Sequence, residues 1–136
     1  MAREVTPTAP RVAPAVTPAN FHYWTGGASG ELRILRNKRT NAWISPFEDD
    51  SVEGAEPVTL SGKATVYTFT VNYQKYHPDV QPPYVVALVE LVEAPGIRLP
   101  TNIVNCATDA IEIGMPVRVV FEPCGEYFLP LFEPDM

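Results

Sequence analysis

Two strongly β-patterned runs in the middle of the chain constrain the fold most. The run at residues 64–71 alternates, with Tyr67 and Phe69 on one face and threonines on the other, the period of two that is typical of a half-buried strand. The run at residues 84–92 is apolar on both faces. That pattern indicates a central, bent strand of a small barrel, because a surface strand shows polar alternation.

Three shorter β-patterned runs follow at residues 99–104, 116–122 and 127–132. Gly and Pro residues fall between the runs, except for Pro100, which indicates a strand edge or a bulge. Residues 109–114 predict one helical turn between the third and fourth strands. Five short strands in this order match the five-stranded Greek-key barrel called the OB-fold, which we assign to residues 58–136.

The N-terminal part of the chain has a different composition. Residues 1–18 contain four prolines among Ala, Val and Thr, which predicts a flexible tail. Asn20 is a candidate N-cap for a short helix at residues 21–25, which Gly26 and Gly27 end.

A β-ribbon follows the helix, formed by residues 31–36 and 42–44, and an acidic loop then spans residues 45–57. We therefore expect three segments: a tail at 1–18, a helix with a ribbon at 19–57, and a barrel at 58–136. The predicted fold class is mainly β.

Composition restricts the classes of partner. The 136-residue chain carries a net charge of −6, whereas nucleic-acid-binding proteins normally present a basic surface. No apolar run approaches the ~20 residues that span a bilayer, and the N-terminus lacks the apolar region of a secretory signal. We expect a cytoplasmic protein without membrane contact, in which Cys106 and Cys124 remain free thiols.

Several short motifs follow one another along the chain in a characteristic order. They are Trp24, Gly30–Arg33, Trp43 with Pro46, Ser61–Gly62 with Thr65–Thr70, Pro83–Leu91, Thr101–Val104, Ile113–Glu122 and Leu129–Phe132. Over roughly residues 20–134 they closely resemble the family catalogued as domain of unknown function thirty-five. The resemblance implies a short helical region, a rubredoxin-like zinc ribbon and a C-terminal OB-fold. It also implies partners, because members typically accompany thiolase-like acyltransferases and lipid-transfer-protein-like aldolases that act on acyl-CoA.

The chain departs from this family at the metal site. The family's ribbon presents two Cys-x-x-Cys pairs, and alignment on Trp43 and Pro46 places those positions at Asn37, Thr40, Ser51 and Gly54. A structural zinc site uses four thiolate or imidazole ligands, and none of these residues supplies one. The sequence therefore predicts a degenerate ribbon without zinc, and no other cofactor.

Two groups of residues are candidates for binding acyl-CoA or a protein partner. Four of the ten basic residues, Arg33, Arg36, Lys38 and Arg39, lie on the ribbon, where they could bind the phosphates of coenzyme A. Alternatively, they form a solvated face that pairs with the acidic loop 48–56. The connection between the two long strands offers Tyr73, Tyr76, His77 and Tyr84 for the same role, or it packs over the mouth of the barrel.

The aromatic residues of the short helix are candidates for a protein interface. Phe21, Tyr23 and Trp24 either contact a partner or pack within the chain.

The sequence does not contain a recognisable arrangement of catalytic residues. His22 and His77 lack a partner, and neither cysteine has a nearby base that would lower its pKa. Together with the partners that the family resemblance implies, this predicts a non-catalytic accessory subunit that binds and stabilises a thiolase-like acyltransferase or aldolase and helps to bind acyl-CoA. The alternative is an OB-fold that stacks single-stranded nucleic acid on Tyr67, Tyr73 or Tyr84, against which the acidic composition argues.

The missing cysteines lead to a direct test. The untagged protein should purify without stoichiometric zinc, because the four aligned positions offer no soft anionic ligand. Plasma emission spectroscopy measures this, and one zinc per chain would contradict the prediction.

Overall fold

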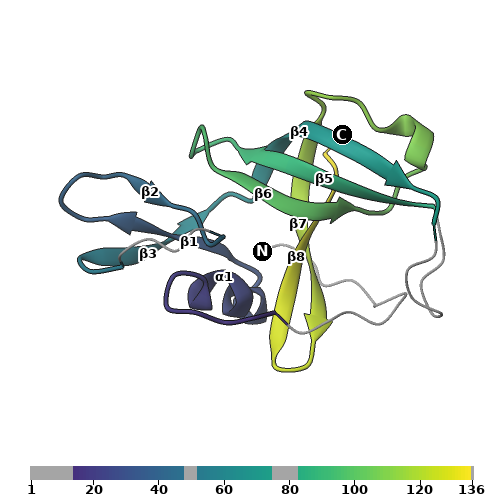
Figure 1. The fold of residues 1–136 in the computed structure, drawn as a ribbon. Coiled ribbons are helices and arrows are strands. Elements are labelled where there is room, and N and C mark those ends of the chain that lie inside the picture. Colours follow the sequence, from purple (N-terminus) through teal and green to yellow (C-terminus); the bar gives the residue numbers. More distant parts are fainter. Residues whose placement is uncertain (1–13, 48–51, 75–82, 136) are drawn as a thin grey trace.

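A computed structural model describes residues 14–47, 52–74 and 83–135 of the chain. It contains one short α-helix, a three-stranded antiparallel sheet and a closed five-stranded barrel, with the sheet projecting from one end of the barrel (Figure 1). The mainly β class and the OB-fold are thereby confirmed. Most of the predicted tail, residues 1–13, lies outside the described residues. Within the described part, no helix is long and apolar enough to cross a membrane.

The helical segment consists of α1 (Phe21–Thr25) followed by the 3-10 helix η1 (Gly26–Ser29). Asn20 occupies the predicted N-cap position, but its side chain makes no hydrogen bond to the helix. Its Oδ1 instead accepts a 2.7 Å hydrogen bond from the N–H of Thr17, and its Nδ2 donates to the carbonyl of Ala15. Asn20 therefore holds the turn that precedes the helix.

The small sheet has the strand order β2 (Trp43–Ile44), β1 (Leu32–Asn37), β3 (Ala55–Leu60). The hairpin of β1 and β2 agrees with the predicted ribbon, but β3 includes residues that the sequence assigned to a loop. Pro57 is tolerated there because β3 is an edge strand. The chain passes from this sheet to the barrel at Ser61–Gly62, so the boundary expected after residue 57 falls inside β3.

The barrel strands follow the sequence pattern closely. They are β4 (Lys63–Asn72), β5 (Tyr84–Leu91), β6 (Arg98–Ile103), β7 (Pro116–Cys124) and β8 (Tyr127–Pro134), in the order β4-β5-β6-β8-β7. The 3-10 helix η2 (Thr108–Ala110) lies between β6 and β7, close to the predicted helical turn. Pairing between β6 and β8 is parallel and consists of one residue pair, Ile103 with Phe132. Pro100 is therefore accommodated on a strand with little pairing on one side.

A β-bulge changes the face of β4. The register with β5 shifts between Val66 and Thr68, so Tyr67 points outward and is 44% exposed. The prediction that Tyr67 shares the buried face with Phe69 is therefore wrong, because an extra residue in one strand reverses the alternation beyond it. On β5, Val86 is 40% exposed, so one of the two apolar faces of that strand faces solvent.

One hydrophobic core joins the helix, the small sheet and the barrel. Tyr23 from α1, Leu32 and Ile34 from β1, and Phe121 and Phe132 from the barrel are all buried in the same cluster. Figure 1 shows α1 between the small sheet and the β7–β8 hairpin. The N-terminal segment is thus packed as part of a single core.

Gly27 of η1 packs closely against the barrel. A Cβ atom there would lie 2.3 Å from Cβ of Phe128 and 2.9 Å from Cδ1 of Phe121. Such distances are shorter than any normal contact, so η1 packs this closely only because residue 27 has no side chain.

We expect Gly27→Ala to lower the free energy of unfolding by about 1–3 kcal/mol, the usual effect of overpacking a core. Ala28→Ser is the matched control, because Ala28 is an exposed residue of the same turn and should change stability by less than about 0.5 kcal/mol. Denaturant unfolding measures both variants. Equal stabilities would show that η1 is not held against the barrel as described.

Candidate functional site: the basic turn of the small sheet

The four basic residues of the ribbon do not form one uniform patch. Arg33 on β1 forms an ion pair with Glu31 and lies 3.4 Å from the hydroxyl of Thr59. The hydrogen bond from Arg33 lowers the pKa of the Glu31 carboxyl below its usual value. Arg33 therefore already has an acidic partner in the chain.

Arg36 is neutralised in the same way. It lies opposite Trp43 on β2 and opposite Glu56 on β3, so these three residues form one row across the sheet. Its guanidinium carbon is 5.4 Å from the Trp43 ring centroid, and a terminal nitrogen is 3.6 Å from the Glu56 carboxylate. This row ties the three strands together and leaves little of the Arg36 charge for a ligand.

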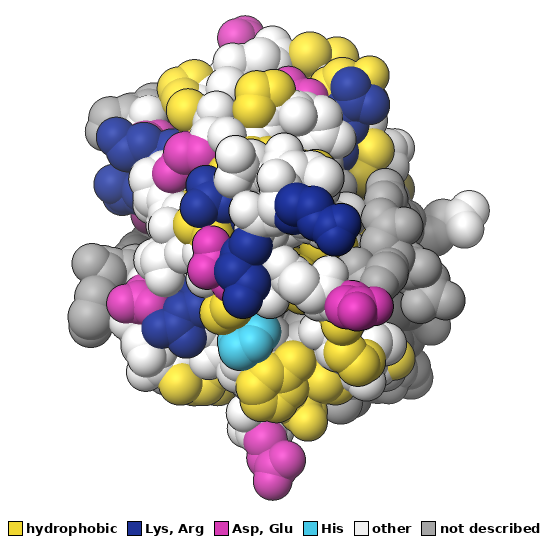
Figure 2. Space-filling model, turned by 90° about the vertical axis from the view of Figure 1, so that its left-hand side faces the viewer, with side chains coloured by type: hydrophobic (Ala, Val, Ile, Leu, Met, Phe, Trp, Pro, Cys, Tyr) yellow, Lys and Arg dark blue, Asp and Glu magenta, His cyan; other side chains and the backbone are white. Residues whose placement is uncertain are grey.

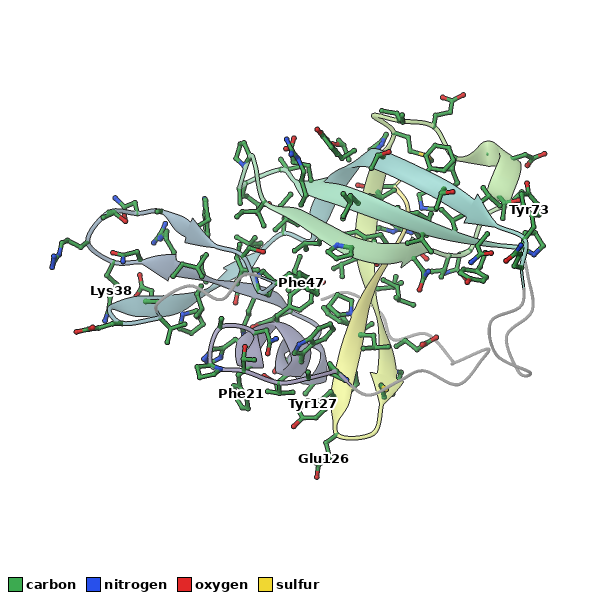
Figure 3. The ribbon with its side chains drawn as sticks, viewed as in Figure 1. Phe21, Lys38, Phe47, Tyr73, Glu126 and Tyr127 are labelled. Atoms are coloured by element: carbon green, nitrogen blue, oxygen red, sulfur yellow. The ribbon has the colours of Figure 1, made fainter. Side chains whose placement is uncertain are left out.

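Lys38 and Arg39 differ from these two arginines. Both are exposed in the turn after β1, and neither has an acidic partner within the described part of the chain. Lys38 marks the far tip of the small sheet in Figure 3, and Figure 2 shows Lys and Arg side chains on the face at this end, with Asp and Glu among them. Of the predicted basic cluster, the turn supplies the cations that remain available to a ligand.

The turn itself is closed by a side chain. Asn37 Oδ1 accepts hydrogen bonds from the backbone N–H groups of Arg39 and Thr40, at 2.8 and 3.1 Å. Its backbone accepts a bond from the N–H of Asn41, which has a positive φ of 61°, and Lys38 N–H donates to the carbonyl of Gly54. These hydrogen bonds link the β1–β2 turn to the segment before β3 without the help of a metal ion.

Three of the four aligned zinc positions meet at this turn. Asn37, Thr40 and Gly54 line a hollow of about 380 Å³ together with Arg39 and Glu53, whereas Ser51 lies outside the described residues. The residues do not fit a zinc ion, because Gly54 has no side chain and the Asn37 oxygen is already engaged by two N–H groups. Absence of zinc remains a prediction.

The aromatic candidates on the helix separate into two groups. Tyr23 is 1% exposed, and burial raises the pKa of its phenol, so its ring belongs to the core and is not available to a partner. Trp24 is half-buried, with its ring centroid 4.8 Å from that of Tyr23. Phe21 is 47% exposed, and Phe47, which the sequence did not single out, is 44% exposed beside Tyr23 and Trp24.

The tyrosines after β4 lie far from the basic turn. Tyr73 is 73% exposed at the end of the barrel opposite the small sheet (Figure 3). Tyr84 is half-buried, and its hydroxyl accepts a hydrogen bond from Asn72. Tyr76 and His77 lie outside the described residues. The structure thus does not bring Lys38 and Arg39 together with Tyr73 in one site.

A cleft that the sequence did not indicate lies where the small sheet meets the barrel. It measures about 540 Å³, and the charged side chains on its wall are Glu31, Lys63, Arg118 and Asp135. Arg118 bonds to the buried carboxylate of Glu133 at 2.8 Å and lies 3.8 Å from Asp135. Acidic and basic groups are balanced on this wall, so it favours neither sign of ligand.

Potential catalytic groups are dispersed. Burial raises the pKa of the Cys106 thiol, which lowers the fraction of nucleophilic thiolate. Among the described residues, no three His, Cys, Asp or Glu side chains are grouped so that they could hold a metal ion.

Together these features define a class of protein: an OB-fold barrel joined through a common core to a small ribbon-like sheet with a basic turn. The family described as "ChsH2, C-terminal OB-fold domain" matches residues 57–122. A solved structure described as "Ltp2-ChsH2(DUF35) aldolase" has a TM-score of 0.76 and 34% identity to this chain, covering 90% of this chain and 98% of that one. The chain belongs to the DUF35 family, as its sequence motifs predicted.

Curated relatives include larger proteins. The "probable enoyl-CoA hydratase alpha subunit" of Thermomonospora curvata is 37% identical over 96% of this chain and 42% of its own length. The "3-oxo-4,17-pregnadiene-20-carboxyl-CoA hydratase alpha subunit" of Mycobacterium tuberculosis is 33% identical over 83% of this chain and 37% of its own. The chain thus spans about two fifths of these relatives. A "DUF35 domain-containing scaffold protein" of Methanocaldococcus jannaschii is 42% identical over 52% of this chain and 50% of its own.

The closure of the basic turn can be tested at Asn37. Asn37→Ala should lower the free energy of unfolding by about 0.5–1.5 kcal/mol, because two backbone N–H groups lose their acceptor. Asn37→Asp keeps an acceptor oxygen and should retain most of the stability. Hydrogen exchange at the Arg39 and Thr40 amides should accelerate in the Ala variant and stay slow in the Asp variant. Unchanged exchange in Asn37→Ala would contradict this account of the turn.

Proposed function

We propose that the chain is a non-catalytic accessory subunit of an acyl-CoA-processing complex. It binds a thiolase-like acyltransferase or a lipid-transfer-protein-like aldolase, stabilises that partner and contributes to binding the acyl-CoA. The observation that carries this proposal is the similarity, over 90% of the chain, to a DUF35 chain of an aldolase assembly. The names of the two hydratase relatives place similar chains in other CoA-thioester enzymes.

The chemistry of the described residues supports an accessory role. Cys106 is a poor nucleophile because its pKa is raised, and Glu31, Arg118 and Asp135 of the cleft are engaged in ion pairs. Catalysis requires a nucleophile or base in reach of an orienting group. The reacting groups are therefore assigned to the partner.

Two exposed surfaces support binding to another protein. The first surface contains the exposed Phe21 of α1 and, in the lower part of Figure 3, the half-buried Tyr127 of the β7–β8 hairpin. The second is the outer face of β5 and β6, where Val86 and Pro100 are exposed and Leu88 is half-buried. Exposed apolar side chains that serve no core of their own are typical of protein interfaces.

A nucleic-acid role has less support in the geometry. The Arg98 guanidinium lies 3.9 Å from the centroid of the Tyr67 ring and is paired with Glu90, so one face of that ring is covered. The Tyr84 hydroxyl is bonded to Asn72. Base stacking needs open aromatic faces within a positive groove.

Co-expression with a thiolase-like or aldolase partner tests the proposal. The two chains should co-purify, and turnover of the acyl-CoA should require both. Phe21→Glu should weaken the complex about tenfold or more, because a charge would enter an apolar contact, whereas Ile113→Glu, at a 68% exposed residue of the β6–β7 connection, should have little effect. Turnover by the isolated chain, or no complex with either partner class, would refute the accessory role.

A further inference from the structure

We propose that the hollow at the basic turn, lined by Asn37, Arg39, Thr40, Glu53 and Gly54 and adjoined by Lys38, is a binding site for a phosphate monoester. The phosphate on the ribose of coenzyme A has this chemistry. The choice of coenzyme A as its source rests on the proposed function, whereas the phosphate chemistry rests on the residues of the turn. The site lies at three of the four positions that align with the family's zinc ligands, namely Asn37, Thr40 and Gly54.

The residues at these positions suit an anion, whereas the ligands of a zinc site suit a cation. Four thiolates attract a cation, whereas the residues here present hydrogen-bond donors. Asn37 Oδ1 is occupied by the N–H groups of Arg39 and Thr40, which leaves its NH₂ group as a donor. Thr40 Oγ1 accepts a 3.2 Å hydrogen bond from the N–H of Ala42, which leaves its hydroxyl hydrogen to donate.

Charge adds to this donor set. Arg39 lines the hollow, and Lys38 is its neighbour in the same exposed turn, whereas Arg33 and Arg36 are neutralised by Glu31 and Glu56. A phosphate monoester concentrates nearly two negative charges on one phosphorus, whereas the bridging pyrophosphate spreads its two charges over two phosphorus atoms, so a compact pair of cations attracts the monoester more strongly. The site therefore favours a terminal phosphate over the bridging pyrophosphate of the same cofactor.

One residue of the lining opposes an anion. Among the described residues, Glu53 is the carboxylate that lines the hollow, and its charge repels a phosphate. Its removal should therefore strengthen binding, while removal of the two cations should weaken it. Variants with opposite expected effects separate a specific site from general loss of structure.

The measurement is calorimetric titration of the full chain at low salt with three probes: coenzyme A, its analogue without the ribose phosphate, and inorganic phosphate. We expect coenzyme A to bind at least about tenfold more tightly than the analogue. Amide NMR shifts should concentrate at Arg39, Thr40 and Gly54. Inorganic phosphate should shift the same amides, and if it binds as tightly as coenzyme A, the site is a phosphate site whose ligand is free phosphate.

The double variant Lys38→Gln, Arg39→Gln should reduce the affinity at least tenfold, and Glu53→Gln should increase it several-fold. Arg98→Gln is the control, because Arg98 is an exposed, paired arginine on the barrel and should change nothing. Equal affinity for coenzyme A and its analogue, or no effect of the double variant, would overturn the proposal. If the phosphate proposal fails but the chain still forms a complex with its partner enzyme, the accessory function remains supported. If the chain binds phosphate selectively but forms no complex with a partner enzyme, only the accessory function is refuted.

Discussion

The structure depends on the burial of one set of apolar side chains that belongs to three elements at once. Tyr23 of the helix and Leu32 and Ile34 of β1 are buried in the same cluster as Phe121 and Phe132 of the barrel. A three-stranded sheet with a two-residue edge strand has too little apolar surface to be stable by itself. Because Leu32 and Ile34 are buried in this common core, the sheet is anchored to the barrel and the helix, and its turn lies at the far tip of the molecule.

The base and the tip of the small sheet are stabilised in different ways. The base is held by the common core, to which Leu32 and Ile34 of β1 contribute. The tip is held by short-range contacts: the row of Arg36 with its two cross-strand neighbours, and the Asn37 side chain that accepts two backbone N–H groups. Local hydrogen bonds thus do what a metal ion does in a zinc ribbon, and the residues around them can take on another role.

The distribution of charged and apolar side chains on the surface suits a protein that acts by binding other molecules. Two of the four basic side chains on the small sheet are paired within the chain, and the two in the turn are exposed. Exposed apolar residues lie elsewhere, on α1 and on the outer face of the barrel. The proposed phosphate site and the proposed protein interfaces therefore lie at separate places on the molecule.

The sequence by itself determined the features that depend on near neighbours: the barrel strands, the β1–β2 hairpin, the short helix and the lack of cysteines at the aligned zinc positions. Only the tertiary structure decided the features that depend on distant residues. The pairing of β3 with β1 gave Arg36 its acidic partner, the bulge in β4 turned Tyr67 outward, and packing against the barrel buried Tyr23. The reason is physical: alternation and turn residues are local, whereas burial and charge pairing are set by segments that meet only when the chain folds.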